Sequence, residues 1–406
     1  MQSTSSGRPR PRFVGLAPMV VGVIAIVILA VALRVSFGGS AGASPPPSTP
    51  LSPPPGSPSP QVTGAPSTPP SPPALLPLPE GLTNRTWVTL SPVEGVGYVA
   101  GTLDGSAHLV LPEGESPLAA SDGRVLAVRY GPVAASGLAT TSTVILRDVA
   151  TGKVIVEVER PGAIATAVMD AETAYVAALS TELPGEVPGV DALSLADGSV
   201  REVIPPQVVA VDPKGQAPWN AASRGVLSLS PSGRTLGSCI WLNNLCDIET
   251  LDLGTGTLTR AVTGLAGGLW LLSDEVLATL GDVGTSGYDI AAGKLLWVIE
   301  GARAQSGYLL SDGLTLVEAY QDVGSSARIV ATVDLRSGGR HELLNTPKEE
   351  LNPSLWAEAS NDRYAVLIPG GQGFPDALAG TGSFLADLLD LSTGQIERAA
   401  LRVSTR

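Results

Sequence analysis

Asp148-Val-Ala-Thr-Gly152 is a short turn that returns along the chain and decides its fold. Gly reaches positive φ at no steric cost, and the Asp or Thr side chain hydrogen-bonds its own backbone. Each copy follows one apolar or alternating run and precedes another, so each is predicted to be a hairpin turn. The other copies are Asp252-Leu-Gly-Thr-Gly256, Asp289-Ile-Ala-Ala-Gly293, Asp334-Leu-Arg-Ser-Gly338, Asp390-Leu-Ser-Thr-Gly394 and the weaker Ser194-Leu-Ala-Asp-Gly198.

A second recurring turn precedes these turns along the chain, and Ser121-Asp-Gly-Arg-Val-Leu-Ala127 is its clearest copy. The two turns together define a unit of four strands, with a variable loop between the second strand and the third. Their spacing is mostly near the forty to fifty residues typical of a four-stranded propeller blade. The remaining copies begin at Ser91, Asp170, Ser230, Ser273, Ser311 and Ser360.

The chain is predicted to be all-β, because no amphipathic helix of any length separates these units. We expect a β-propeller of four-stranded blades, in which radial repetition leaves only short sheet edges. Seven units predict seven blades. The first unit, residues 87–111, is short, and the alternative of six blades follows if it pairs with the C-terminal strand.

Two stretches carry a resemblance to known repeats. The copies that begin at Ser121 and Ser230 resemble the inner hairpin of WD40-like and TolB-type repeats. Tyr288-Asp-Ile-Ala-Ala-Gly-Lys-Leu-Leu-Trp297 resembles the outer hairpin of the quinoprotein (PQQ-like) repeat. The resemblance covers residues 87–401 and implies the propeller fold, but propellers host binding and catalysis alike. A Trp follows the Gly-Lys turn once, at Trp297, so no quinone or other cofactor is expected.

Residues 13–37 are predicted to form a transmembrane signal-anchor helix. The run from Phe13 to Leu33 has no charged residue and is long enough to span a bilayer. Three Arg precede it and one follows, which places residues 1–12 in the cytoplasm and the rest of this single-pass protein outside the cell membrane. The alternative is a signal peptide cleaved near Ala43, which would release a secreted protein. Both interpretations export the C-terminal part.

Residues 38–79 are predicted to be a disordered Pro/Ser-rich linker, and residues 80–406 the propeller domain. Sixteen of residues 44–79 are Pro, which lacks a backbone N–H and favours extended geometry in its neighbours. Such a stretch is typical of a semi-rigid spacer. The residues after 79 carry 38 acidic against 21 basic side chains, a net charge of −17. This balance argues against binding nucleic acid, which needs a basic surface. The amino-acid composition is typical of proteins from GC-rich genomes, which suggests a bacterial source.

A binding site is expected on one end of the propeller, where long loops connect second strands to third strands and one blade to the next. Aromatic anchors and acidic groups on these loops would contact a ligand or partner. The alternative for each residue is ordinary loop solvation. The candidate residues are Trp219, Trp241, Asn243, Asn244, Asp322, Phe374 and Asp376.

Cys239 and Cys246 are the only cysteines, and they bracket the predicted loop between the second and third strands of the fourth blade. In an exported chain this placement predicts a disulfide across that hairpin. The bond would hold Trp241, Asn243 and Asn244 rigidly. A metal site is not expected, because no His lies nearby.

The favoured function is a binding module that recognises an extracytoplasmic protein, a cell-wall glycan or a small ligand through its loops. The alternative is an extracytoplasmic hydrolase or lyase that uses acidic residues in the propeller channel. No catalytic residue is assigned, since the two His, His108 and His341, lie far apart and no nucleophile elbow is present.

Overall fold

The computed structural model describes part of the chain. The chain divides into two units, residues 1–73 and 74–406, and every described residue belongs to the second. The predicted tail and membrane segment, and the linker as far as residue 77, lie outside the described residues. None of the described residues belongs to a helix that could cross a bilayer. The structure describes residues 78–404 except 90–91, 93–96, 105, 135–136, 180–185, 209–222, 243–244, 266–267, 282–283, 301, 323–327, 347–351, 356–359 and 371–382.

The described residues form β-strands and turns, and their paired strands run antiparallel. We number the main sheets in chain order. The first sheet has three strands, β1 (Thr86–Val88), β2 (Val99–Thr102) and β3 (His108–Val110). The second sheet has four, β4 (Glu115–Ser121), β5 (Arg124–Tyr130), β6 (Thr141–Asp148) and β7 (Val154–Pro161). The third sheet contains β8 (Ala163–Met169), β9 (Thr173–Leu179), β11 (Val190–Ser194) and β12 (Val200–Ile204), and beside it β10 (Glu186–Val187) pairs with β13 (Gln207–Val208).

Four more sheets complete the described part, each with four strands. The fourth contains β14 (Ser223–Leu229), β15 (Thr235–Leu242), β16 (Leu245–Asp252) and β17 (Thr257–Leu265). The fifth contains β18 (Gly268–Leu271), β19 (Val276–Gly281), β20 (Gly284–Asp289) and β21 (Lys294–Glu300). The sixth contains β22 (Ala302–Leu309), β23 (Thr315–Asp322), β24 (Arg328–Asp334) and β25 (Arg340–Thr346). The seventh contains β26 (Asn352–Leu355), β27 (Tyr364–Gly370), β28 (Ser383–Asp390) and β29 (Ile396–Ser404).

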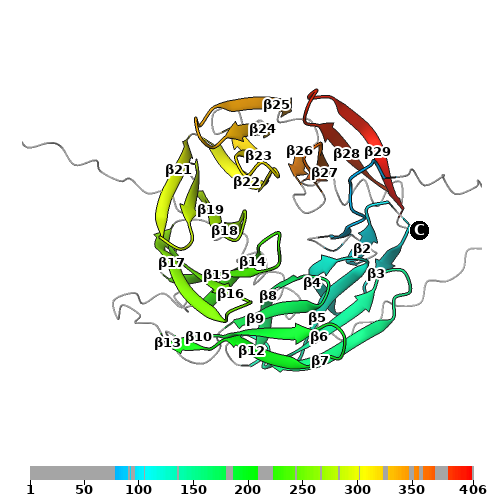
Figure 1. Cartoon of the computed structure of the whole chain (residues 1–406). Helices are drawn as coiled ribbons and strands as arrows, with labels where there is room; N and C mark the ends of the chain where they lie inside the picture. The colour runs from blue at the N-terminus through cyan, green and yellow to red at the C-terminus, as the bar shows by residue number, and fades with distance from the viewer. Residues whose placement is uncertain are drawn as a thin grey trace, which may run out of the picture. The chain divides into compact units, whose positions relative to one another are not determined.

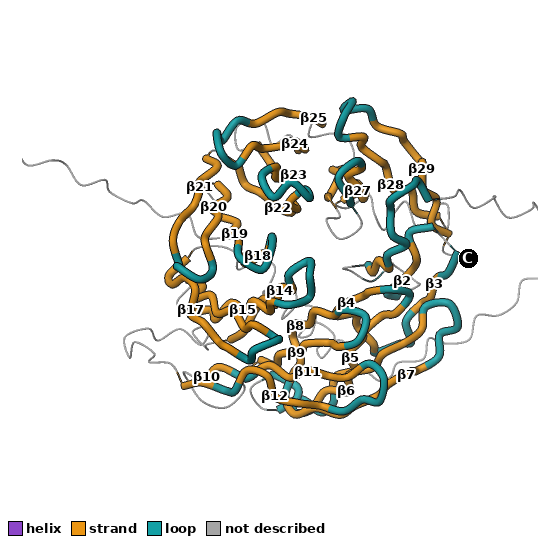
Figure 2. Tube along the Cα trace, in the orientation of Figure 1, coloured by secondary structure: helices purple, strands orange, loops and turns teal. Residues whose placement is uncertain are grey.

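The sheets follow one another around a ring, with the first strand of each four-stranded sheet nearest the centre (Figure 1). The tube in Figure 2 shows the same succession of strands around the ring, with turns and loops joining them. β2 of the first sheet contacts β29 of the seventh. The predicted all-β architecture of blade-like four-stranded sheets is therefore confirmed.

The apolar core lies between neighbouring sheets. Leu126 and Leu146 of the second sheet pack against Ile164 and Val176 of the third, and none is more than 2% exposed. Val125, adjacent to Leu126, packs instead against the first sheet. Because a middle strand buries side chains on both faces, it is a continuous apolar run. This explains why Val, Leu and Ala follow each of the Ser-type turns.

The recurring Asp turn has the predicted chemistry. Asp148 Oδ1 accepts hydrogen bonds from the backbone N–H and hydroxyl of Thr151, at 2.7 and 2.6 Å. Gly152 has a φ of 70° and donates its N–H to the Asp148 carbonyl. Val149, which follows Asp148, donates its N–H to the carbonyl of Gly123, in the turn between the first and second strands of the same sheet. Both turns therefore lie together at one end of the ring, which we call the turn end; the opposite end is the loop end.

The first sheet differs from the sequence-based prediction. Leu103 donates its N–H to the Arg85 carbonyl, the bond that Val149 makes to Gly123 in the second sheet. β1, β2 and β3 therefore correspond to the second, third and fourth strands of the other sheets. The Ser91 segment connects β1 to β2, so its interpretation as a turn between first and second strands is wrong. In the described residues, β29 pairs with β28 and not with the first sheet.

Candidate functional site

The loop end of the fourth sheet brings Trp241 together with the two cysteines. β15 and β16 form a hairpin whose ladder runs from Thr235 opposite Asp252 to Leu242 opposite Leu245. The two residues of its tip, Asn243 and Asn244, lie outside the described part. In a long hairpin with a two-residue connection, the strand register fixes which face of the sheet each side chain near the tip occupies.

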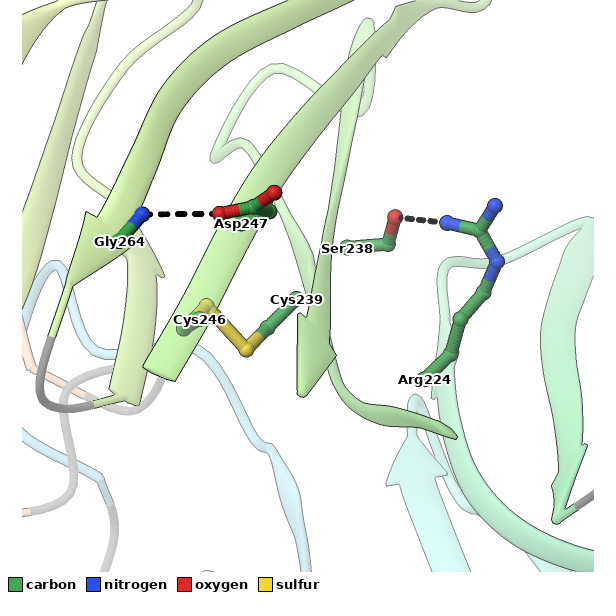
Figure 3. Close-up of a disulfide and its surroundings, with 6 residues drawn as sticks. All are labelled: Arg224, Ser238, Cys239, Cys246, Asp247 and Gly264. Carbon is green, nitrogen blue, oxygen red and sulfur yellow. Dashed lines mark hydrogen bonds between the residues drawn. A yellow bond between two sulfur atoms is a disulfide. The ribbon is translucent and has the colours of Figure 1, made fainter. Parts of the chain in front are cut away.

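Cys239 and Cys246 are bonded to each other across this hairpin, with their Cα atoms 5.5 Å apart (Figure 3). Cys239 lies opposite Ile248, and Cys246 lies opposite Trp241. The two cysteines therefore occupy diagonal positions on one face of the sheet, and both are fully buried. That face packs against Leu269, Leu271 and Leu277 of the fifth sheet. The disulfide consequently belongs to the core between two sheets.

Trp241 lies in β15 and packs against the same apolar cluster. Its ring lies over Gly225 of β14, where a Cβ atom would come 2.3 Å from Trp241 Cδ1. Only a glycine at position 225 leaves room for this ring. Trp241 is thus a half-buried strand residue that crosses the innermost strand.

The opposite face of the sheet carries a buried ion pair. Arg224 Nη1 donates to Glu249 Oε2 at 3.0 Å and to Ser238 Oγ at 2.6 Å. Its Nε donates to the carbonyl of Pro188, which lies between β10 and β11, at 2.8 Å. Gln207 donates to both oxygens of Glu249 at 3.1 Å. These bonds join the third and fourth sheets.

The Arg224 side chain has no solvent exposure. Burial lowers the pKa of its guanidinium, while Glu249 opposes this change. Arginine starts far above neutral pH, so the group stays charged. Within the described part of the chain, Arg224 Nη2 is buried and makes no hydrogen bond. It is a cationic donor fixed beneath the loop end.

Asp247 extends the polar face outward, because its Oδ1 accepts the Gly264 N–H at 2.8 Å (Figure 3). Arg260 lies 4.0 Å from Asp247 and 3.9 Å from Glu249. Glu249 thus has a buried arginine partner, Arg224, and a more distant exposed one, Arg260. The fourth sheet therefore has an apolar face with the disulfide and a charged face with Arg224.

The other sequence-predicted residues are not brought to this site. Asp322 is the last residue of β23 and lies opposite Ala302, so its backbone belongs to a strand and not to a loop. Trp219, Phe374 and Asp376 lie outside the described residues. No cluster of three or more His, Cys, Asp or Glu suited to a metal ion occurs among the residues that the structure describes.

Sequence reasoning missed the buried ion pairs. Arg224 and Glu249 lie in strands that read as ordinary alternating runs. Their meeting follows from register: Arg224 lies opposite Ile240, which is two residues from Ser238 in β15, and Ser238 lies opposite Glu249. A hairpin built outward from the two cysteines would have placed Ser238 beside Glu249. Arg224, from the neighbouring strand, has no comparable local signal.

Two further buried acids were missed. Glu318 Oε1 accepts two hydrogen bonds from Arg340, at 3.1 and 2.7 Å, while its Oε2 is buried without one. Burial raises the pKa of Glu318 above its ordinary value, against the pull of Arg340. Burial also acts on Glu115, but hydrogen bonds from Arg147 and Arg129 hold the pKa of Glu115 below its usual range.

Comparison with known proteins supports the fold. No protein-family model matches the sequence, and no curated protein matches it. A solved protein from Lactobacillus plantarum is 14% identical, with a TM-score of 0.50 over 79% of this chain and 97% of that one. TolB from Acinetobacter baumannii is 18% identical, with a TM-score of 0.40, over 69% of this chain and 65% of that one, less than two thirds of its length.

An oligogalacturonate lyase from Vibrio parahaemolyticus is 10% identical, with a TM-score of 0.43 over 78% of this chain and 85% of that one. Identities this low concern the fold alone. The described part of the chain therefore has a β-propeller fold.

Proposed function

We propose that the protein is a membrane-anchored extracytoplasmic β-propeller that binds a partner protein, a cell-wall glycan or a small ligand at its loop end. The uncharged run at 13–33 and the Pro-rich stretch support an anchor and a stalk. The proposal includes seven blades of the WD40-like and PQQ-like type, with the three-stranded first sheet as one of them.

One observation carries the binding role. The disulfide and the buried Arg224–Glu249 pair both lie in the fourth sheet, on opposite faces, near the tip of the β15–β16 hairpin. A rigid base beneath variable connections is how a scaffold presents a binding surface at low entropic cost. Trp241 lies at the same level and is half-buried, which suits an aromatic anchor.

The test is cross-linking of the full-length chain on intact cells with a reagent that cannot cross the membrane. We expect an adduct with the native chain that is weakened by Trp241→Ala. Trp297→Ala is the matched control, because Trp297 also lies over a glycine, Gly287, but on the outermost strand of the fifth sheet. Equal loss in both variants, or no adduct with the native chain, would contradict binding at the loop end.

A hydrolase or lyase ranks second and has one supporting observation. A buried carboxyl with a raised pKa is typical of general acids, and Glu318 has this property. Its side chain is fully buried and Arg340 holds one oxygen, so it has no route to a substrate in this arrangement. If the full-length chain hydrolyses or cleaves a glycan, survival of that activity in Glu318→Gln would exclude Glu318 as its general acid, and Glu115→Gln is the matched control.

A further inference from the structure

A cleft of about 290 Å³ opens at the turn end between the fourth and fifth sheets. Five threonines and two aspartates line it, and Ile290 and Ala291 form its apolar side. It lies at the end opposite the proposed partner site, and its role does not depend on that function.

Four of the threonines come from two ladder rows on one face of the fourth sheet, and Thr255 lies in the turn between β16 and β17. Thr235, Asp252 and Thr257 form the outer row, and Gly237, Thr250 and Thr259 form the inner row. This face is turned toward the fifth sheet, since a Cβ atom on Gly237 would come 2.9 Å from Leu269.

The repeats supply an internal comparison for the inner row. In the second sheet the same row, matched by its ladder pairing, holds Leu126, Leu146 and Val156. All three are buried and fill the space against the third sheet. In the fifth sheet, Trp297 covers Gly287 at the equivalent place. Only small or hydroxyl side chains occupy the inner row of the fourth sheet, and the cleft remains.

The hydroxyls of this row are not used within the protein. Thr250 is 3% exposed, and neither its hydroxyl nor that of Thr259 makes a hydrogen bond in the described part of the chain. The apolar residues of the second sheet offer no hydroxyl at these positions. The position is therefore suited to a bound group that both donates and accepts.

The aspartates at the rim are held in place. Asp274 accepts hydrogen bonds from the hydroxyls of Ser230 at 2.7 Å, Ser232 at 2.8 Å and Thr235 at 3.0 Å. Asp252 accepts from the Thr255 N–H at 2.9 Å and from Arg234 at 3.0 Å. No basic side chain lines the cleft, so these carboxylates disfavour an anionic ligand.

We propose that this cleft binds a neutral, hydroxyl-rich ligand of about one sugar ring. Threonine hydroxyls can donate to and accept from ligand hydroxyls, and ionised carboxylates accept from them. Ile290 and Ala291 offer the apolar surface against which the C–H face of a ring packs. The volume is close to the lower limit of small-molecule sites, roughly 300 Å³, which excludes a longer glycan from full enclosure.

The experiment uses the full-length chain in detergent micelles, with D-glucose, N-acetyl-D-glucosamine and D-mannitol as probes at millimolar concentration. Saturation-transfer NMR measures binding, and titration gives the dissociation constant. We expect saturable binding of at least one probe. Thr250→Val, which keeps the shape but removes the hydroxyl, should weaken it about tenfold, the scale of one lost hydrogen bond.

Three further arms keep the test sharp. Thr250→Ser should retain binding because it keeps the hydroxyl. Thr332→Val is the matched control, since Thr332 has the same place in the sixth sheet but does not line the cleft. Thr259→Val is a second loss variant should Thr250→Val fail to fold. No saturable binding of any probe, binding indifferent to both loss variants, or Ca²⁺ binding in place of the probes would overturn the proposal.

Discussion

Arg224 donates to Glu249 at 3.0 Å where the arginine side chain has no contact with solvent. A buried charge with its partner removed is far more costly than an exposed one, because the remaining ion loses both water and its counter-ion. The pair also reaches the third sheet through the Pro188 carbonyl. It is thus both an electrostatic unit and a link between blades.

Arg224→Met is expected to lower the free energy of unfolding by about 3–5 kcal/mol, because Glu249 then keeps a buried charge without its main partner. Urea unfolding followed by circular dichroism measures this. Arg234→Met is the control: Arg234 pairs with Asp252 but is 62% exposed, so its loss should cost at most about 1 kcal/mol. Similar costs for the two variants would show that the Arg224 pair is not effectively buried.

The double variant Arg224→Met/Glu249→Met should be less destabilised than the sum of the two single variants. Both buried charges are then gone, and no unpaired ion remains. A double-mutant cycle in urea provides the coupling free energy. Simple additivity would contradict a direct interaction between the two side chains.

Cleavage of the disulfide should destabilise the protein. The bond closes a short loop with a sequence separation of seven residues, so chain entropy predicts a loss of about 2–3 kcal/mol. Cys239→Ala/Cys246→Ala tests this in urea. Mass spectrometry of the native protein should show a gain of two hydrogens on reduction. Two free thiols in protein isolated from the cell surface would refute the bond.

Glu318 should give stability an unusual pH dependence. Its pKa is raised in the folded chain, so between the ordinary Glu value and that higher value the folded chain binds more protons than the unfolded chain. Its contribution to stability is therefore present at low pH and is lost as pH rises through the window. The unfolding free energy of Glu318→Gln, relative to native, should improve as pH increases.

Glu115 provides the opposite case in the same protein. Its pKa is lowered by Arg147 and Arg129, so its contribution is present above the ordinary Glu value and is lost as pH falls. Glu115→Gln should cost most near neutral pH and progressively less in acid. Parallel pH profiles for the Glu115 and Glu318 variants would contradict the two assigned environments.

The blades could be predicted because the turns between their strands are determined by a few neighbouring residues. An Asp that bonds its own turn and a Gly at positive φ act within five residues, as at Asp148 and Gly152. The first sheet was misassigned because Ser91-Pro-Val resembles the second recurring turn, whose clearest copy begins at Ser121, whereas the bond that defines the sheet joins Leu103 to Arg85. The partner with which a strand pairs depends on tertiary contacts, and a turn motif does not determine it.

The candidate site was predictable in part for the same reason. Two cysteines around a hairpin tip indicate their own pairing, since both residues lie in one local element. Arg224 and Glu249 lie in different strands, β14 and β16, and Arg224 also bonds to Pro188 beside the third sheet. No spacing in the sequence therefore indicates that the two residues pair. Trp241 was expected on a loop surface; the glycine beneath it, Gly225, shows that its ring belongs to the sheet.

Membrane topology is the last prediction, and protease treatment of intact cells tests it. An anchor at 13–37 followed by the Pro-rich stretch leaves the propeller outside, with the linker as its most accessible segment. We expect release of a fragment of about 330 residues, as residues 80–406 require. Replacing Arg8, Arg10 and Arg12 with Glu should reduce insertion in the predicted orientation, because the positive charges expected to hold the N-terminus inside would be gone. Full protection of the native chain from the protease would contradict the predicted orientation. Release of the propeller into the medium without added protease would favour cleavage near Ala43 instead.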